Sequence, residues 1–231
     1  MSELPKQPAL SVIIPVLNEA EQIVAALQAL APLRARGAEI IVVDGASTDE
    51  TIALATPLAD RIVTSAPGRA TQMNAGAALA HGGVLLVLHA DTQLPADADR
   101  LILNGLAQTG RAWGRFDVAI GGHHPLFPLI AASMNARSRL TGIATGDQAM
   151  FVRREAFDAA GGFPEIALME DITLARSLKR ISPPLCLRAR VTTSGRRWEQ
   201  RGIVRMIFLM WRLRLAYFFG ADPKELARRY G

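Results

Sequence analysis

Ionisable side chains stand directly after several apolar runs of this chain. The apolar run at 84–88 passes straight into His89 and Asp91. A carboxylate at the end of a buried strand is costly to desolvate unless a cation or hydrogen-bond donors compensate it. We therefore expect Asp91, and with it His89, to hold Mn²⁺ or Mg²⁺ against a diphosphate. The alternative is that Asp91 caps the helix that follows.

A repeated strand-loop-helix pattern places these residues. Apolar runs beginning near residues 10, 39, 61 and 84 are each followed by a loop and by apolar residues at helical spacing. Four such units predict a parallel sheet wound with helices, in which ligands bind beyond the carboxyl ends of the strands. Glu19, Asp44, Arg69 and Asp91 follow strand ends or begin helices, so they should converge on one crevice.

The pattern changes after residue 110. The segment 110–122 predicts an antiparallel-type strand, and 125–146 predicts a helix that leads into a loop. A strand, a short helix and a Gly-Gly-Phe-Pro turn precede a helix that opens at Glu170 and Asp171. We expect one α/β domain over 1–231, with a nucleotide-binding half at about 10–110 and an acceptor half at about 111–200.

Charge is unevenly distributed along the chain. Residues 1–187 carry a net charge of −3, and residues 188–231 carry +8. A basic tail rich in aromatic residues favours a membrane surface over nucleic acid, so no nucleic-acid partner is expected. The single cysteine, Cys186, and the polar start predict a cytoplasmic protein, peripheral on the inner face of the membrane if the tail binds there.

Glycine-rich phosphate loops are missing from the sequence. Neither G-x-G-x-x-G nor G-x-x-x-x-G-K-[ST] occurs, which disfavours simple dinucleotide or P-loop binding. Six segments instead resemble, in order, the inverting family-two glycosyltransferases of the GT-A fold, and more narrowly a small bacterial branch with an H-A-D metal motif. These segments are VIIPVLNE, IIVVDGASTDET, GRATQMNAGA, HADTQLP, GDQAMFVRR and GGFPEIALMEDITLARSLKR.

The resemblance covers about residues 10–200 and implies both a fold and an activity. The implied fold is α/β, with a mostly parallel twisted sheet, helices on both faces and a C-terminal helix. The implied enzyme uses Mn²⁺ or Mg²⁺ to move a sugar, with inversion, from a nucleotide-diphosphate sugar to an unknown hydroxyl acceptor. A nucleotide-sugar-binding protein without transferase activity and a sugar-phosphate nucleotidyltransferase are the alternatives.

Site residues are carried over from the same resemblance. Asp171 matches the general base and Glu170 is its neighbour; the other interpretation is that both only complement the helix dipole. Asp91 matches the metal-binding aspartate, with His89 where the family has another aspartate. The residues implied for the nucleotide sugar are Pro15, Leu17, Glu19, Asp44, Arg69, Asn74, Asp91, Asp147 and Gln148. Those considered for the acceptor or the diphosphate are Arg115, Arg197 and Trp198.

Departures from the family pattern concern three positions. The usual D-D-G is here Asp44-Gly45-Ala46, so one acidic contact is missing. His89 replaces an acid. The Q-x-x-R-W of processive synthases keeps only Arg197 and Trp198, which disfavours processive synthesis.

The tail at 201–220 predicts one amphipathic helix. Its charge-free stretches are far shorter than the roughly 20 residues that span a bilayer. Arg201, Arg205 and Arg212 should share one side, with Arg214 on the other. The helix therefore either lies on a membrane surface or packs on the domain or on a second subunit of a homo-oligomer.

Overall fold

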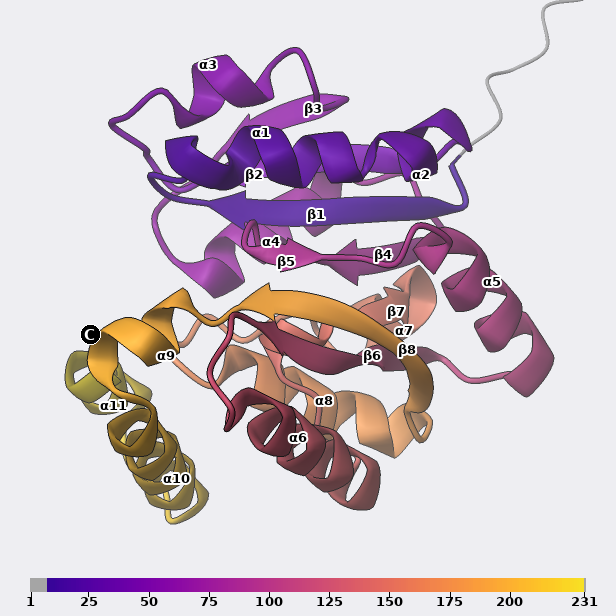
Figure 1. Ribbon diagram of the computed structural model, residues 1–231. Helices are drawn as coiled ribbons and strands as arrows, with labels where there is room; N and C mark the ends of the chain where they lie inside the picture. The colour runs from indigo at the N-terminus through magenta and orange to yellow at the C-terminus, as the bar shows by residue number, and fades with distance from the viewer. Residues whose placement is uncertain (1–7, 231) are drawn as a thin grey trace, which may run out of the picture.

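The computed structural model describes residues 8–230, and within them one curled eight-stranded sheet runs through the protein (Figure 1). Its strand order is β3-β2-β1-β4-β7-β6-β8-β5. Strands β1 to β4 are parallel, while β7 runs antiparallel to both β4 and β6. The predicted mostly parallel sheet is confirmed. The strands are β1 (Leu10–Val16), β2 (Glu39–Asp44), β3 (Arg61–Thr64), β4 (Val84–Val87), β5 (Thr92–Gln93), β6 (Trp113–Gly121), β7 (Phe151–Arg153) and β8 (Leu185–Ser194).

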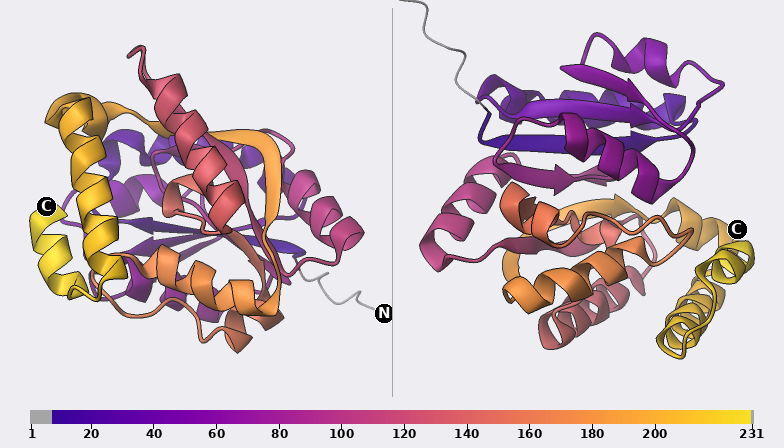
Figure 2. Two further views of the ribbon diagram at one scale, coloured as in Figure 1. Left: turned by 90° about the horizontal axis from the view of Figure 1, so that it is seen from below. Right: turned by 180° about the vertical axis from the view of Figure 1, so that it is seen from behind.

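Helices cover both faces of the sheet, as predicted. Figure 1 shows α1, α2 and α5 on the near side, and the view from behind in Figure 2 shows α4, α7 and α8 on the other side. The helices are α1 (Ala20–Ala29), α2 (Ala31–Ala35), α3 (Thr51–Ala55), α4 (Arg69–Leu79), α5 (Ala98–Thr109), α6 (Phe127–Thr141), the 3-10 helix η1 (Gly146–Gln148), α7 (Arg154–Ala159), α8 (Glu170–Ile181), α9 (Arg196–Arg201), α10 (Ile203–Phe218) and α11 (Pro223–Tyr230).

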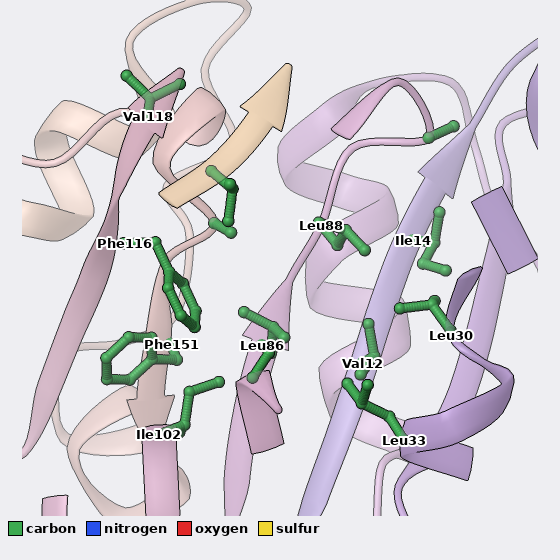
Figure 3. Close-up of a cluster of buried hydrophobic side chains, with 14 of the residues drawn as sticks. Val12, Ile14, Leu30, Leu33, Leu86, Leu88, Ile102, Phe116, Val118 and Phe151 are labelled. Carbon is green, nitrogen blue, oxygen red and sulfur yellow. The ribbon is translucent and has the colours of Figure 1, made fainter. Parts of the chain in front are cut away.

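Alternation along the strands builds two cores. Val12 and Ile14 of β1 face one core, and Ile13 between them faces the other, because successive side chains of a strand point to opposite faces. Figure 3 shows the first core, where Leu30 and Leu33 lie against β1. Ile102 lies near Leu86 and Phe151 in the same core. Strands buried on both faces need apolar residues throughout, which explains the unbroken apolar runs of β1, β2 and β4.

The first half of the described chain comprises residues 8–110, and the second half comprises residues 111–230. In the second half, β6 pairs antiparallel with β7 only at Trp113 and Gly114 but parallel with β8 from Gly114 to Gly121, so the expected antiparallel strand is mainly a parallel one. The strand β8 lies between β6 and the short β5.

The C-terminal segment differs from the single helix predicted at 201–220. Gly202 has φ of 83°, a conformation that side chains other than glycine rarely adopt, and it separates α9 from α10. Arg201 therefore belongs to α9 and does not continue the face of Arg205 and Arg212. None of the helices in residues 8–230 has the length and apolar character needed to cross a membrane.

Candidate active site

The loops after β1 and β2 are joined by hydrogen bonds at the carboxyl end of the sheet. The backbone N–H of Asn18, in the loop after β1, donates to Ser47 Oγ of the loop after β2 at 2.9 Å. In return the Thr48 N–H donates to Asn18 Oδ1 at 2.9 Å, and the Glu19 N–H donates to Thr51 Oγ1 at 2.8 Å. These bonds hold the two loops, and Glu19 with them, in one arrangement.

Asp44 ends β2 as a buried carboxylate that accepts the Ser47 N–H at 3.1 Å. Beneath it, the amide of Gln72 donates to the carbonyls of Val16 at 2.8 Å and Val43 at 2.9 Å. A Cβ on Gly45 would come within 2.9 Å of the Gln72 side chain, so the close approach requires glycine there. On the neighbouring strand, Pro15 is half-buried and Leu17 is 47% exposed.

A small pocket gathers four of the predicted site residues. Arg69 from the start of α4, His89 after β4, and Glu170 with Asp171 from the start of α8 all line it. The remaining lining residues are Met73, Val87, Gly146, Met150 and Phe163. Residues far apart in the sequence thus meet at the carboxyl ends of the strands, where ligands of such sheets bind.

Asp171 is held by backbone donors. Its Oδ2 accepts the Gly146 N–H at 2.8 Å, and its Oδ1 accepts the Ile172 N–H at 2.6 Å. A Cβ on Gly146 would lie 2.6 Å from the ring of His89, so Gly146 also lets the imidazole pack against the backbone. Gly146 was not among the predicted site residues, although it directly precedes Asp147 and Gln148 in the GDQ segment, which was the available signal.

Glu170 is a buried acid, with 6% of its surface exposed. Burial first, and the charge of Asp171 second, raise its pKa from the ordinary 4.5 to about 7. The attraction of Arg69 offsets only part of this. For Arg69 itself, desolvation lowers the pKa, but attraction to Glu170 and other acidic groups outweighs it, so its pKa lies above the ordinary value.

Asp91 lies on a turn closed by a bond from the Thr92 N–H to the His89 carbonyl at 3.0 Å, and its side chain is exposed. The expected buried carboxylate at this position is therefore wrong, because β4 has already ended at Val87. Asp91 is not a helix cap either, since α5 begins after Asp97.

A metal at Asp91 would need ligands from the substrate. Within residues 8–230, no three His, Cys, Asp or Glu side chains are grouped closely enough to hold an ion by themselves. An exposed carboxylate with an imidazole nearby nevertheless fits Mg²⁺ or Mn²⁺, which are commonly bound by one or two carboxylates together with substrate phosphates.

Two of the other predicted residues, Gln148 and Arg115, are used by the fold. Gln148 is fully buried, and its amide accepts the Thr145 N–H at 3.3 Å and donates to Asn135 at 3.4 Å. Arg115 is fully buried and paired with Asp117. These contacts leave Gln148 and Arg115 without access to a ligand in the open crevice.

Asn74 connects the two halves. Its amide donates to the Phe163 carbonyl at 2.8 Å and accepts the Phe163 N–H at 2.9 Å. Asp147 is half-buried in η1, and Trp198 packs partly against the first core. Arg197 lies in α9, but its side chain is outside the described residues.

Comparison with known proteins agrees with this arrangement. Residues 11–161 match the model of glycosyl transferase family 2. No curated protein sequence matches the chain. Among solved structures, TarS 1–349 from S. aureus is similar with a TM-score of 0.65 at 17% identity, over 80% of this chain and 60% of that one.

Two further structures share the fold. A mannosyltransferase from Pyrobaculum calidifontis in complex with GDP-Man and Mn²⁺ has a TM-score of 0.65 at 20% identity, over 98% of this chain and 70% of that one. Glucosyl-3-phosphoglycerate synthase from Mycobacterium tuberculosis, in complex with Mn²⁺, UDP and glucosyl-3-phosphoglycerate, has a TM-score of 0.61 at 20% identity, over 81% and 71% of the two chains. The family match covers well over half of the sequence, and we conclude that this chain belongs to glycosyl transferase family 2 and has the GT-A fold of these structures.

Proposed function

We propose that this enzyme transfers a sugar, with inversion, from a nucleotide-diphosphate sugar to a hydroxyl acceptor, with Asp171 as the general base. The observation that carries the proposal is the position of Asp171, a carboxylate aimed by the Gly146 N–H into the pocket shared with Arg69 and His89. A base must lie within hydrogen-bond reach of the acceptor hydroxyl, and a carboxylate fixed by backbone donors meets that demand with little reorganisation.

The donor side of the site is proposed from the strand ends. Asp44 would accept a hydrogen bond from the base, and the sugar diphosphate would lie toward Arg69 and Asp147. Pro15, Leu17 and Glu19 would line the nucleoside pocket. Support comes from related structures of this fold, which contain UDP-GlcNAc, GDP-Man or UDP.

Asp91, together with His89, would hold Mn²⁺ or Mg²⁺, and the ion would supply positive charge to the leaving diphosphate. The protein itself supplies charge through Arg69. On the acceptor side, the hydroxyl oxygen attacks the sugar from the face opposite the departing diphosphate. As it attacks, the hydroxyl proton passes to Asp171. A Glu170 that is partly protonated near pH 7 limits the repulsion that a second full charge would exert on Asp171.

A titration of the donor and metal tests this assignment. Asp91→Asn should weaken Mn²⁺-dependent binding of UDP-sugars and GDP-Man at least tenfold, whereas His89→Asp should preserve or tighten it. Calorimetry with and without Mn²⁺ measures both. Unchanged metal-dependent binding by Asp91→Asn would show that the metal assignment is wrong.

The product separates the proposed reaction from its alternatives. A transferase releases a nucleoside diphosphate, whereas a nucleotidyltransferase releases pyrophosphate. A binding protein without activity would release neither under conditions in which the donor is bound.

We also propose that α10 attaches the enzyme to an anionic membrane surface. The helix buries Ile203, Met206 and Leu213 against the protein, so packing accounts for one face only. The opposite face exposes large apolar side chains spaced four and three residues apart, which places them in one stripe. This α10 stripe consists of Val204, Phe208, Trp211, Leu215 and Phe218.

Charge complementarity favours a lipid as the occupant of the α10 stripe. Arg205 and Arg212 are both exposed beside it, where each would contribute about 1 kcal/mol of attraction to anionic headgroups. Replacing both by Gln should therefore weaken binding to anionic vesicles by about 2 kcal/mol, or roughly thirtyfold. Co-sedimentation at low and high salt measures this. Parent protein that stays in the supernatant at both salt concentrations, or that elutes as a dimer lost on Trp211→Ala, would contradict the membrane assignment.

A further inference from the structure

Three arginines of the second half keep buried nitrogen atoms without hydrogen-bond acceptors, and one of them, Arg115, is already paired with Asp117 through another nitrogen. Arg137 of α6 has its Nε and Nη2 buried in this way, and Arg214 of α10 has its Nε; no acceptor for them occurs among the described residues. Leaving a buried donor unpaired costs about 1–3 kcal/mol, and more when the group is charged. Other arginines are paired, such as Arg36 with Asp99 at 2.7 Å.

Arg214 lies on a helix that packs against the start of α8, where the base is. Around Arg214, Leu213 packs with Met169 and Ile172 at the start of α8, and the Tyr217 hydroxyl lies 2.5 Å from Thr173 Oγ1. Figure 2 shows α10 beside that end of α8.

Electrostatic interactions connect Arg137 with both Arg214 and Asp171. Burial first, and the charge of Arg214 second, lower the pKa of Arg137 to about 10, while Asp171 acts in the opposite direction. Two guanidinium groups and the base therefore lie within electrostatic reach of one another.

Protein carboxylates close to the pair are already engaged. Asp117 binds both Arg115 and Arg139, and the two oxygens of Asp171 accept the Gly146 and Ile172 N–H groups. Asp147 also attracts Arg137, but it accepts neither of the buried N–H groups of that arginine. An anion with several acceptor oxygens would satisfy the buried N–H groups and remove the repulsion between the two cations.

We propose that Arg137 and Arg214 bind a phosphate or carboxylate group of the acceptor, whose hydroxyl then points to Asp171. The assignment rests on the proposed transferase function and names its acceptor class as anionic. The donor diphosphate is a poorer match, because neither arginine lines the pocket that contains Arg69 and His89. Both arginines come instead from helices of the second half.

Inorganic phosphate is the probe. The parent protein, saturated with UDP and Mg²⁺ to fill the donor site, should bind phosphate and melt at a higher temperature with it than with chloride at equal ionic strength. Arg137→Gln and Arg214→Gln should each weaken phosphate binding at least tenfold. Arg180→Gln is the matched control, because it removes the same charge from the exposed far end of α8.

Stability without phosphate separates a ligand site from a structural role. Removing a buried cation that lacks a partner should leave the melting temperature of Arg137→Gln unchanged or raise it, whereas loss of a structural contact would lower it. A parent that does not distinguish phosphate from chloride, or variants that bind phosphate as the parent does, would overturn the proposal.

Parallel UDP titrations keep this test separate from the proposed function. Variants that lose UDP and phosphate together would assign the arginines to the donor diphosphate and overturn the acceptor site. Phosphate binding by a parent that fails to bind UDP would refute the donor assignment alone. sn-Glycerol 3-phosphate, succinate and phosphatidate vesicles, compared on the same variants, then distinguish a soluble phosphate, a carboxylate and a lipid headgroup.

Discussion

The two halves of the sheet treat polar groups differently. At the strand ends of the first half, Asn18, Ser47 and Asp49 satisfy neighbouring backbone groups, so these loops are complete without a ligand. In the second half, Glu170 is buried and Arg137 is half-buried, and the pKa of each is moved toward the neutral form. Preorganisation is therefore inexpensive in the first half, whereas the second half retains uncompensated charge that a substrate could relieve.

The largest effect is expected from altering the proposed base, Asp171, in the second half. Asp171→Asn keeps the shape and can still accept the Gly146 N–H, but it cannot take a proton. We expect donor affinity to stay within a few-fold and turnover to fall by about 10² or more, equivalent to about 2.7 kcal/mol. Donor titration and steady-state rates on the same preparations measure the two effects.

Glu170→Gln is the companion variant for activity and should lose less than Asp171→Asn. Equal turnover of Asp171→Asn and the parent on the true acceptor would move the base elsewhere. A joint loss of donor affinity and turnover would show that Asp171 serves binding.

The next largest effect is expected in the pH dependence of folding stability, to which the buried Glu170 contributes. The pKa of Glu170 is about 7 in the folded protein and near 4.5 in the unfolded chain. Between those pH values the unfolded chain releases this proton while the folded protein keeps it, so folding stability falls as the pH rises and stays lower above 7. Glu170→Gln should therefore be more stable than the parent above pH 7, by about 2 kcal/mol, and the difference should disappear below pH 4.5.

Urea unfolding at several pH values, with chelator present to exclude metal, measures that difference. Exposed Glu165→Gln is the matched control and should shift stability by less than about 0.5 kcal/mol. A Glu170→Gln variant that is less stable than the parent at pH 8 would mean that the carboxylate forms a stabilising contact when ionised.

Sequence patterns predicted the first half well because its determinants are local. Apolar runs and helical spacing recur within each unit, so that Asp44 ends a strand and Arg69 begins the helix after the next strand. The same local logic found the start of α8 at Glu170. It failed at Asp91, because the end of a strand cannot be placed to the residue when the apolar run continues past it.

Predictions in the second half failed where burial depends on distant packing. Half-buried and exposed residues dominate β8, so it has no apolar run to mark it. The burial of Arg115 and Gln148 follows from the cover that other elements provide, which spacing along the chain does not reveal. Gly202 ends a helix here, yet a glycine within a helical pattern is often tolerated.

The smallest expected effect concerns backbone strain in the first half. Its loops are well hydrogen-bonded, but one loop residue has an unfavourable backbone conformation. Ala46, in the loop after β2, is exposed and has φ of 72°, in the left-handed region that costs residues other than glycine about 1–2 kcal/mol. Ala46→Gly removes that cost but gives the unfolded chain more freedom, which returns about 0.4–1 kcal/mol. We expect a net stabilisation of about 0.5 kcal/mol, measured by urea unfolding without ligand. Ala53→Gly is the control, because Ala53 is exposed in α3, where the same change should destabilise by about 1 kcal/mol. If both substitutions destabilise the protein equally, the conformation at Ala46 carries no strain and the first half has no reserve of stability to recover at this position.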